Sequence, residues 1–300
     1  MSEFDLIRSL VDVLAEQSRG GDVELGPGDD CAVINVPPGQ QLVSSIDALL
    51  PGVHYPVNAP AEYIGYRALG VCVSDLAAMG ALPSYALVAL SMCERDRTWL
   101  QAFAKGIKSA AALCKIRIAG GNMAQGPENI SISVHGFVPT GASLLRSGAQ
   151  VGDNVYVTGP LGGAALALSV ALSKSSTVEG PQWNSPYYQV VPQITSGIKL
   201  RGVATSAIDI SDGLVADVGH IAQASGVAIE ITTDKVPVAV NANLSQALYG
   251  GDDYQLCFTS AVDSSSLPIQ ASHIGVVAKG SGVYLDGQKP DGEGYEHFRD

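Results

Sequence analysis

Aspartates beside glycines, or at the ends of apolar segments, are the residues of this chain best suited to chemistry. Eight of them lie in five short segments, GPGDD (26–30), SSID (44–47), VSDLAAMG (73–80), AIDISDG (207–213) and GGDD (250–253). A single Asp-Gly pair is more often only a turn. Several short carboxylate side chains that converge would bind hard cations such as Mg²⁺, which commonly carry nucleotide phosphates. The set therefore predicts metal-dependent phosphoryl transfer.

The AIDISDG segment is the most specific of the five. Asp209 and Asp212 follow an apolar strand and open a helix. An EF-hand loop starting at Asp209 is excluded because its twelfth position is His220 rather than Glu. Capping of the helix by Ser211 or Asp212 remains an alternative. Arg146, in LLRSGA, is the arginine best placed to neutralise phosphate charge.

Other classes of function lack their motifs. The sequence contains no GxxxxGK[ST], GxGxxG, GxSxG or HExxH. The net charge of −12 and the isoelectric point near 4.7 argue against binding to nucleic acid or to an anionic membrane surface. The N-terminus is acidic and no apolar run is long enough to span a membrane, so we expect a cytoplasmic protein.

The five cysteines form no CxxC pair, which favours buried thiols over disulfides or a zinc site. Cys31, directly after GPGDD, precedes an apolar segment and is expected to be such a buried thiol.

Helical and strand patterns alternate through both halves of the chain, which predicts a mixed α+β fold. In the first half we expect helices at 2–17, 60–78 and 97–114, and strands at 31–36, 41–46, 84–92, 115–120 and 129–138, the first two strands forming a hairpin around a Pro-Pro-Gly turn. In the second half we expect strands at 154–159, 204–210, 227–232 and 254–259, and helices at 161–173, up to Leu200, 212–224 and 241–248. The turn-rich segment 139–153 predicts two domains, 1–145 and 146–300.

Nine segments in order resemble the thiamine-monophosphate kinase family of the aminoimidazole ribonucleotide synthetase-like superfamily. They are GPGDDCAV, SSIDALLPGVHY, ALGVCVSDLAAMGALP, GGNMAQG, HGFVPTG, LLRSGAQVGDNVYVTG, AIDISDGLVADVGHI, GGDDYQLCFT and GYEHF. The resemblance implies a two-domain fold in which the N-terminal sheets of a homodimer pair into a β-barrel. It also implies Mg²⁺-dependent transfer of the ATP γ-phosphoryl group to thiamine monophosphate, giving thiamine diphosphate and ADP. The acceptor oxygen is already ionised, so no general base is expected.

The same resemblance assigns roles to individual residues. It implies that several Mg²⁺ ions are held by Asp30, Ser45, Ile46 through its carbonyl, Asp47, Asp75, Asn122, Asp209 and Asp212. It implies that ATP contacts Gly120, Gly121, Asn122, Arg146 and Ser211, and that thiamine monophosphate contacts His54, Asp252 and Tyr295.

Several positions depart from the family pattern. The family's GGDT reads GGNM, with Asn122 and Met123; Ile46 replaces a threonine and Gln193 an arginine; Asp252 and Gln255 replace glutamates. A thioether is a poor ligand for Mg²⁺, so metal affinity should fall. A catalytically weakened nucleotide- or thiamine-phosphate-binding homologue is therefore the alternative to an active kinase. A structural calcium-binding protein is a third hypothesis.

Overall fold

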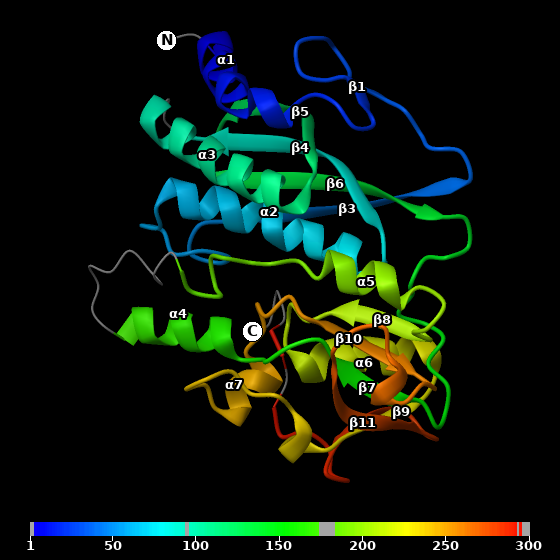
Figure 1. Ribbon diagram of the computed structural model, residues 1–300. Coiled ribbons are helices and arrows are strands. Elements are labelled where there is room, and N and C mark those ends of the chain that lie inside the picture. Colours follow the sequence, from blue (N-terminus) through cyan, green and yellow to red (C-terminus); the bar gives the residue numbers. More distant parts are fainter. Residues whose placement is uncertain (1–2, 94–95, 174–183, 293, 296–300) are drawn as a thin grey trace.

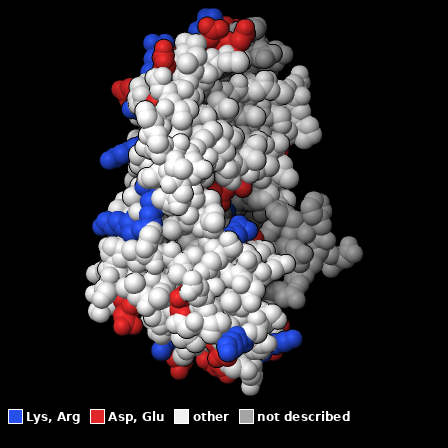
Figure 2. Space-filling model, turned by 90° about the vertical axis from the view of Figure 1, so that its right-hand side faces the viewer, with Lys and Arg blue, Asp and Glu red and all other residues white. Residues whose placement is uncertain are grey.

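The computed structural model describes residues 3–93, 96–173, 184–292 and 294–295. The two halves of the chain each contain a β-sheet with helices packed against it (Figure 1). A view from the side shows acidic and basic side chains together at the waist between the halves, where the surface is hollowed (Figure 2). The chain is mixed α+β, as its sequence predicts. Among the described residues no helix is both long and apolar enough to cross a membrane.

The first sheet has four strands in the order β3-β6-β4-β5. These are β3 (Gln40–Leu49), β6 (Asn129–Pro139), β4 (Leu82–Met92) and β5 (Arg117–Gln125). β6 pairs antiparallel with both neighbours, whereas β4 and β5 are parallel. The helices on one face of the sheet are α1 (Glu3–Leu14), followed by the 3-10 turn Ala15–Gln17, α2 (Ala61–Ala78) and α3 (Arg97–Cys114).

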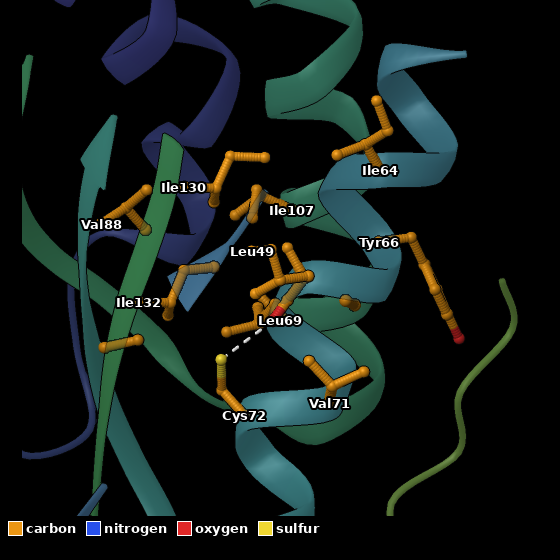
Figure 3. Close-up of a cluster of buried hydrophobic side chains, with 14 of the residues drawn as sticks. Leu49, Ile64, Tyr66, Leu69, Val71, Cys72, Val88, Ile107, Ile130 and Ile132 are labelled. Atoms are coloured by element: carbon orange, nitrogen blue, oxygen red, sulfur yellow. Dashed lines mark hydrogen bonds between the residues drawn. The ribbon is translucent and has the colours of Figure 1, made fainter. Parts of the chain in front are cut away.

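Close contact between α2 and α3 builds the first hydrophobic core. A Cβ on Gly65 would lie 2.2 Å from the Phe103 carbonyl oxygen, and one on Gly106 would lie 1.9 Å from the Glu62 carbonyl oxygen. Only glycine allows the two backbones to approach this closely. The side chains that meet in the core come from α2, α3 and the strands beneath them, and include Leu49, Ile64, Leu69, Ile107, Ile130 and Ile132 (Figure 3).

The opposite face of the first sheet is open and partly apolar. Alternation along β3 and β4 turns Leu42, Ile46, Leu82 and Leu87 away from the helices, with exposed fractions of 50%, 68%, 55% and 37%. Leu42 and Leu82 flank one position of β6, and Ile46 and Leu87 flank another. The four side chains therefore lie on one surface.

The second sheet has six strands in the order β12-β9-β11-β7-β10-β8. These are β7 (Asn154–Val157), β8 (Ser206–Asp209), β9 (Ala228–Ile231), β10 (Leu256–Ser260), β11 (Ser272–Ala278) and β12 (Gly282–Leu285). The helices of this half are α4 (Gly163–Ser173), α5 (Ile194–Leu200), α6 (Leu214–Ser225) and α7 (Leu244–Tyr249), with 3-10 turns at Thr233–Lys235 and Ser264–Ser266. The Leu214, Val218 and Ile221 side chains of α6 are buried in the second core.

Two of the predictions are wrong. The expected hairpin does not form, because β2 (Val33–Ile34) pairs with β1 (Val23–Leu25), whereas the ten residues of β3 all pair with β6. Cys31 is exposed rather than buried, since the loop that carries it lies outside the three hydrophobic clusters. Cys93 is also exposed, and the other three cysteines are buried thiols. β1, β11 and β12 were not expected from the sequence.

The domain boundary near residue 145 remains a prediction. The first sheet ends at Pro139 and the second begins at Asn154. Tyr187, Tyr188 and Val190, however, belong to the first hydrophobic core although they follow the second half's first strand. The two halves therefore share packing across any such boundary.

Candidate active site

Three carboxylates from three different elements interact electrostatically where α2 contacts the second sheet. Asp47 lies on β3, Asp75 near the end of α2, and Asp209 at the end of β8. Asp75 accepts a hydrogen bond from the Ser45 hydroxyl, and it also raises the pKa values of Asp47 and Asp209 by charge repulsion. The structure thus places together four of the residues for which the resemblance implies a metal.

Burial makes the negative charge of this carboxylate cluster energetically costly. Burial, and then the charge of Asp75, raises the pKa of Asp47 to about 6 and that of Asp209 to about 7. Burial also raises the pKa of Asp75, whereas the Ser45 hydrogen bond and the Arg146 charge act in the opposite direction. A divalent cation would neutralise this charge, and hard carboxylate and hydroxyl oxygens are suitable ligands for Mg²⁺. The residues present therefore fit a magnesium site.

The loop Ser211–Gly213 is held by a residue that the sequence analysis missed. One carboxylate oxygen of Asp217, Oδ2, accepts the backbone N–H groups of Ser211, Asp212 and Gly213 at 3.0, 3.1 and 3.1 Å. The N-cap of α6 is Gly213, whose φ is +118°. Simple N-capping of α6 by Ser211 or Asp212, the alternative left open above, is thus wrong. An acidic residue in the first helical turn was the available signal.

Asp212, Asp217 and His220 form a second group near α6. Their ligand atoms lie within 4.8 Å of one another, and they are the one group of this kind found among the described residues. Burial, followed by the charge of Asp212, raises the pKa of Asp217 to about 8. His220 follows Asp217 by three residues on α6, and the loop before the helix brings Asp212 beside both of them.

The residues expected to contact thiamine monophosphate lie around the same loop. The amide of Asp252 donates to the Ser211 carbonyl at 2.8 Å, and the amide of Tyr295 donates to the Asp212 carbonyl at 3.0 Å. His54 is joined to this region through Arg67, which donates to the His54 carbonyl at 3.2 Å and forms an ion pair with Asp252 at 2.5 Å. Arg67 is another residue that the sequence analysis missed.

The remaining expected residues lie away from the carboxylate cluster within one chain. Gly120, Gly121 and Asn122 belong to β5, and two strands separate β5 from the Asp47 strand, a spacing of roughly 14 Å. A Cβ on Gly121 would lie 2.0 Å from the Val88 carbonyl oxygen, so this glycine is already required by strand packing. Asp30 lies in an exposed loop, where its amide donates to the Asp29 side chain at 2.8 Å.

Family models match both halves of the chain. The model for the N-terminal domain of AIR synthase related proteins matches residues 28–138, and the model for their C-terminal domain matches residues 150–287. The chain is therefore a two-domain protein of the AIR synthase related class. The hydrogenase maturation protein HypE, at 18% identity with a TM-score of 0.73, shares this fold.

Closer relatives define the family within that class. The thiamine-monophosphate kinase of Salmonella typhimurium is 36% identical over 99% of this chain and 98% of its own, and that of Aquifex aeolicus is 33% identical with the same coverage. The crystal structure of the Stenotrophomonas maltophilia kinase superposes with a TM-score of 0.84, at 37% identity, and covers 97% of this chain and 98% of that one. AaThiL complexed with AMPPCP and TMP superposes with a TM-score of 0.79, at 31% identity, and covers 99% and 97%. The chain belongs to the thiamine-monophosphate kinase family.

Proposed function

We propose that this protein transfers the γ-phosphoryl group of ATP to thiamine monophosphate, giving thiamine diphosphate and ADP. The observation that carries the proposal is the cluster of Asp47, Asp75 and Asp209. Asp209 is buried and the other two carboxylates are partly buried, and they come from both halves of the chain. The chain is similar along its whole length to kinases of this kind. We place the reaction in the cytoplasm, where ATP is available.

Magnesium would bind to side chains that already share one region. Asp47, Asp75 and Asp209 would supply carboxylates, with the Ser45 hydroxyl hydrogen-bonded to Asp75; Asp212 and the Ile46 carbonyl are further proposed ligands. When bound, the cations would offset the charge of the transferred phosphoryl group. Arg146, whose charge already lowers the pKa of Asp75, would add a positive charge from the protein.

The other groups of the site would orient the two substrates. Ser211 would contact ATP from the loop that Asp217 holds by three backbone hydrogen bonds. His54, Asp252 and Tyr295 would contact thiamine monophosphate. The phosphate oxygen of the acceptor is ionised at neutral pH, so the residues position charge rather than remove a proton.

We also propose that the protein is a homodimer that pairs the open faces of its first sheets. Leu42, Ile46, Leu82 and Leu87 would then be covered by the same residues of the second copy. Gly120, Gly121, Asn122 and Asp30 are retained as proposed ATP and metal contacts, although they lie away from the carboxylate cluster in a single chain.

Incubation with Mg²⁺, ATP and thiamine monophosphate, followed by chromatography for thiamine diphosphate, tests this function. Product that is lost in Asp212→Asn would support the kinase and show that Asn122 is tolerated. Absence of product, together with stabilisation by either ligand, would favour a weakened binding protein. Stabilisation by Ca²⁺ without any dependence on ATP would favour the structural calcium protein.

A further inference from the structure

Arg67 is a buried cation that connects three separate segments of the chain. It lies in α2 with 3% of its surface exposed. Its Nε donates to the His54 carbonyl at 3.2 Å, and one terminal nitrogen donates to the Tyr187 carbonyl at 2.8 Å. The other terminal nitrogen donates to Asp252 Oδ1 at 2.5 Å. The planar fork of an arginine can satisfy all three acceptors at once, whereas the single ammonium of lysine cannot match their positions.

Two tyrosines fix the same groups from the other side. The guanidinium carbon of Arg67 lies 4.1 Å from the centre of the Tyr187 ring and 5.9 Å from that of Tyr254. The Tyr187 hydroxyl donates to the His54 carbonyl at 3.0 Å, and the Tyr254 hydroxyl donates to Asp252 Oδ1 at 3.0 Å. The His54 carbonyl and the Asp252 carboxylate, which both accept from Arg67, therefore each accept a second hydrogen bond from a tyrosine hydroxyl.

The Asp252 loop needs such support because its backbone is strained. Asp252 and Tyr254 have φ values of +60° and +50°, which residues other than glycine rarely adopt. Their amides donate to the carbonyls of Ser211 and Ile210, both at 2.8 Å. The loop that Arg67 holds is thus hydrogen-bonded to the segment after β8, and the Ser211 amide in that segment is also bound independently by Asp217.

Burial alone would lower the pKa of Arg67, but the nearby Asp252, Tyr254 and Tyr187 groups raise it overall. The guanidinium therefore remains charged throughout the working pH range.

We propose that Arg67 is a positioning residue for the acceptor substrate, since it fixes the His54 and Asp252 loops relative to each other. The inference rests on the proposed function, because that function makes these loops the site for thiamine monophosphate. Arg67 touches neither substrate in this proposal. It acts through the His54 carbonyl and the Asp252 carboxylate.

Arg67→Lys tests the proposal, with Arg117→Lys as the matched control. Arg117 also donates to two acceptors, the Glu16 carbonyl and the Gln17 side chain, but these lie near the N-terminal helix. Calorimetric titration should show that Arg67→Lys weakens the binding of thiamine monophosphate by about tenfold, with the affinity for AMPPCP unchanged. The control should alter neither affinity.

Hydrogen exchange supplies a measurement that needs no ligand. The amides of His54, Asp252 and Tyr254 are hydrogen-bonded to backbone carbonyls. They should exchange faster in Arg67→Lys and at the normal rate in Arg117→Lys. If Arg67→Lys does not fold, Tyr187→Phe removes only the second hydrogen bond to the His54 carbonyl, and it should weaken the binding of thiamine monophosphate but not that of AMPPCP.

Unchanged binding of thiamine monophosphate in folded Arg67→Lys would overturn the proposal. An equal decrease in the affinities for thiamine monophosphate and AMPPCP would also overturn it, because a general loss of structure would produce that result. Failure of the wild-type protein to form product would contradict the proposed kinase activity. The role of Arg67 is tested separately, by the ratio of the variant and wild-type affinities for thiamine monophosphate and by the amide exchange rates.

Discussion

Replacement of Asp47 by asparagine should stabilise the metal-free protein at alkaline pH. The Asp47 carboxylate is removed from water beside Asp75, and both effects raise its pKa from an ordinary value of 3.8 to about 6. The folded state therefore binds the Asp47 proton more tightly than the unfolded chain does. Asparagine has nearly the same shape and no charge to bury.

The sign of the pH dependence follows from that difference. Between pH 3.8 and about 6 the folded protein carries more protons, so its free energy of unfolding falls as pH rises, and the full cost is present above that window. At about 1.4 kcal/mol per pKa unit, the cost is at most about 3 kcal/mol at pH 8 and about half of that at pH 5. Asp47→Asn should recover this amount.

Urea unfolding in EDTA at pH 5 and pH 8 measures the effect, with the exposed Asp234 as the site of a matched Asp→Asn control. The gain in Asp47→Asn should be larger at pH 8, whereas the control should stay within about 0.5 kcal/mol at both values. Millimolar Mg²⁺ should stabilise the wild-type protein more than the variant. A variant that is no more stable than the wild type at pH 8 would refute the argument that the ionised Asp47 carboxylate destabilises the metal-free protein.

Three further outcomes can be measured. Asn122→Asp should lower the Mg²⁺ concentration needed for half-maximal activity by restoring a charged ligand; an unchanged or higher demand would remove Asn122 from the metal site. Leu82→Glu places a charge on the open sheet face and should convert a dimer to a monomer in sedimentation without loss of helical signal; a persistent dimer would refute pairing through this face. Gly65→Ala should reduce the free energy of unfolding by about 2 kcal/mol or more, because its Cβ would meet the Phe103 carbonyl. Gly219→Ala, whose Cβ would make only an ordinary contact with the Val283 side chain at 3.9 Å, should not destabilise the protein, so equal losses at the two glycines would contradict the packing argument.

The long helices of the first half could be predicted from local sequence. The predicted helix at 60–78 is observed as Ala61–Ala78, beginning after Pro60, and that at 97–114 as Arg97–Cys114. The second of these is capped by the Asp96 side chain, which accepts from two backbone amides. Caps, proline and helical spacing are all encoded within a few residues.

Strand partners could not be predicted in the same way. The segment around Val33 lies next to Gln40 in the sequence, but β2 pairs with β1 and β3 pairs with a strand about ninety residues further on. Pairing is decided by which faces can be buried together in the whole sheet, and this is not a local property.

The same distinction separates the parts of the site. Asp47, Asp75 and Asp209 were identifiable because each stands at the end of an apolar segment or beside it. Arg67 was not, because it lies within an apolar helix and its partners Tyr187 and Asp252 are 120 and 185 residues away. A buried charge can be identified as buried only when the groups that neutralise it are known.

Two of the departures from the family pattern lie at the nucleotide end of the proposed site. Asn122 is exposed on β5, and Met123 is partly buried against the first core, so both changes lie on a strand separated from the Asp47 strand by two others. Asp252, which replaces a glutamate, still forms its ion pair with Arg67 at the acceptor end of the site. The change at Asn122 would therefore affect how the nucleotide and its metal are held, and not the Arg67 network on the acceptor side. It follows that Asn122→Asp should change the demand for Mg²⁺ without changing the affinity for thiamine monophosphate, whereas Arg67→Lys should do the reverse.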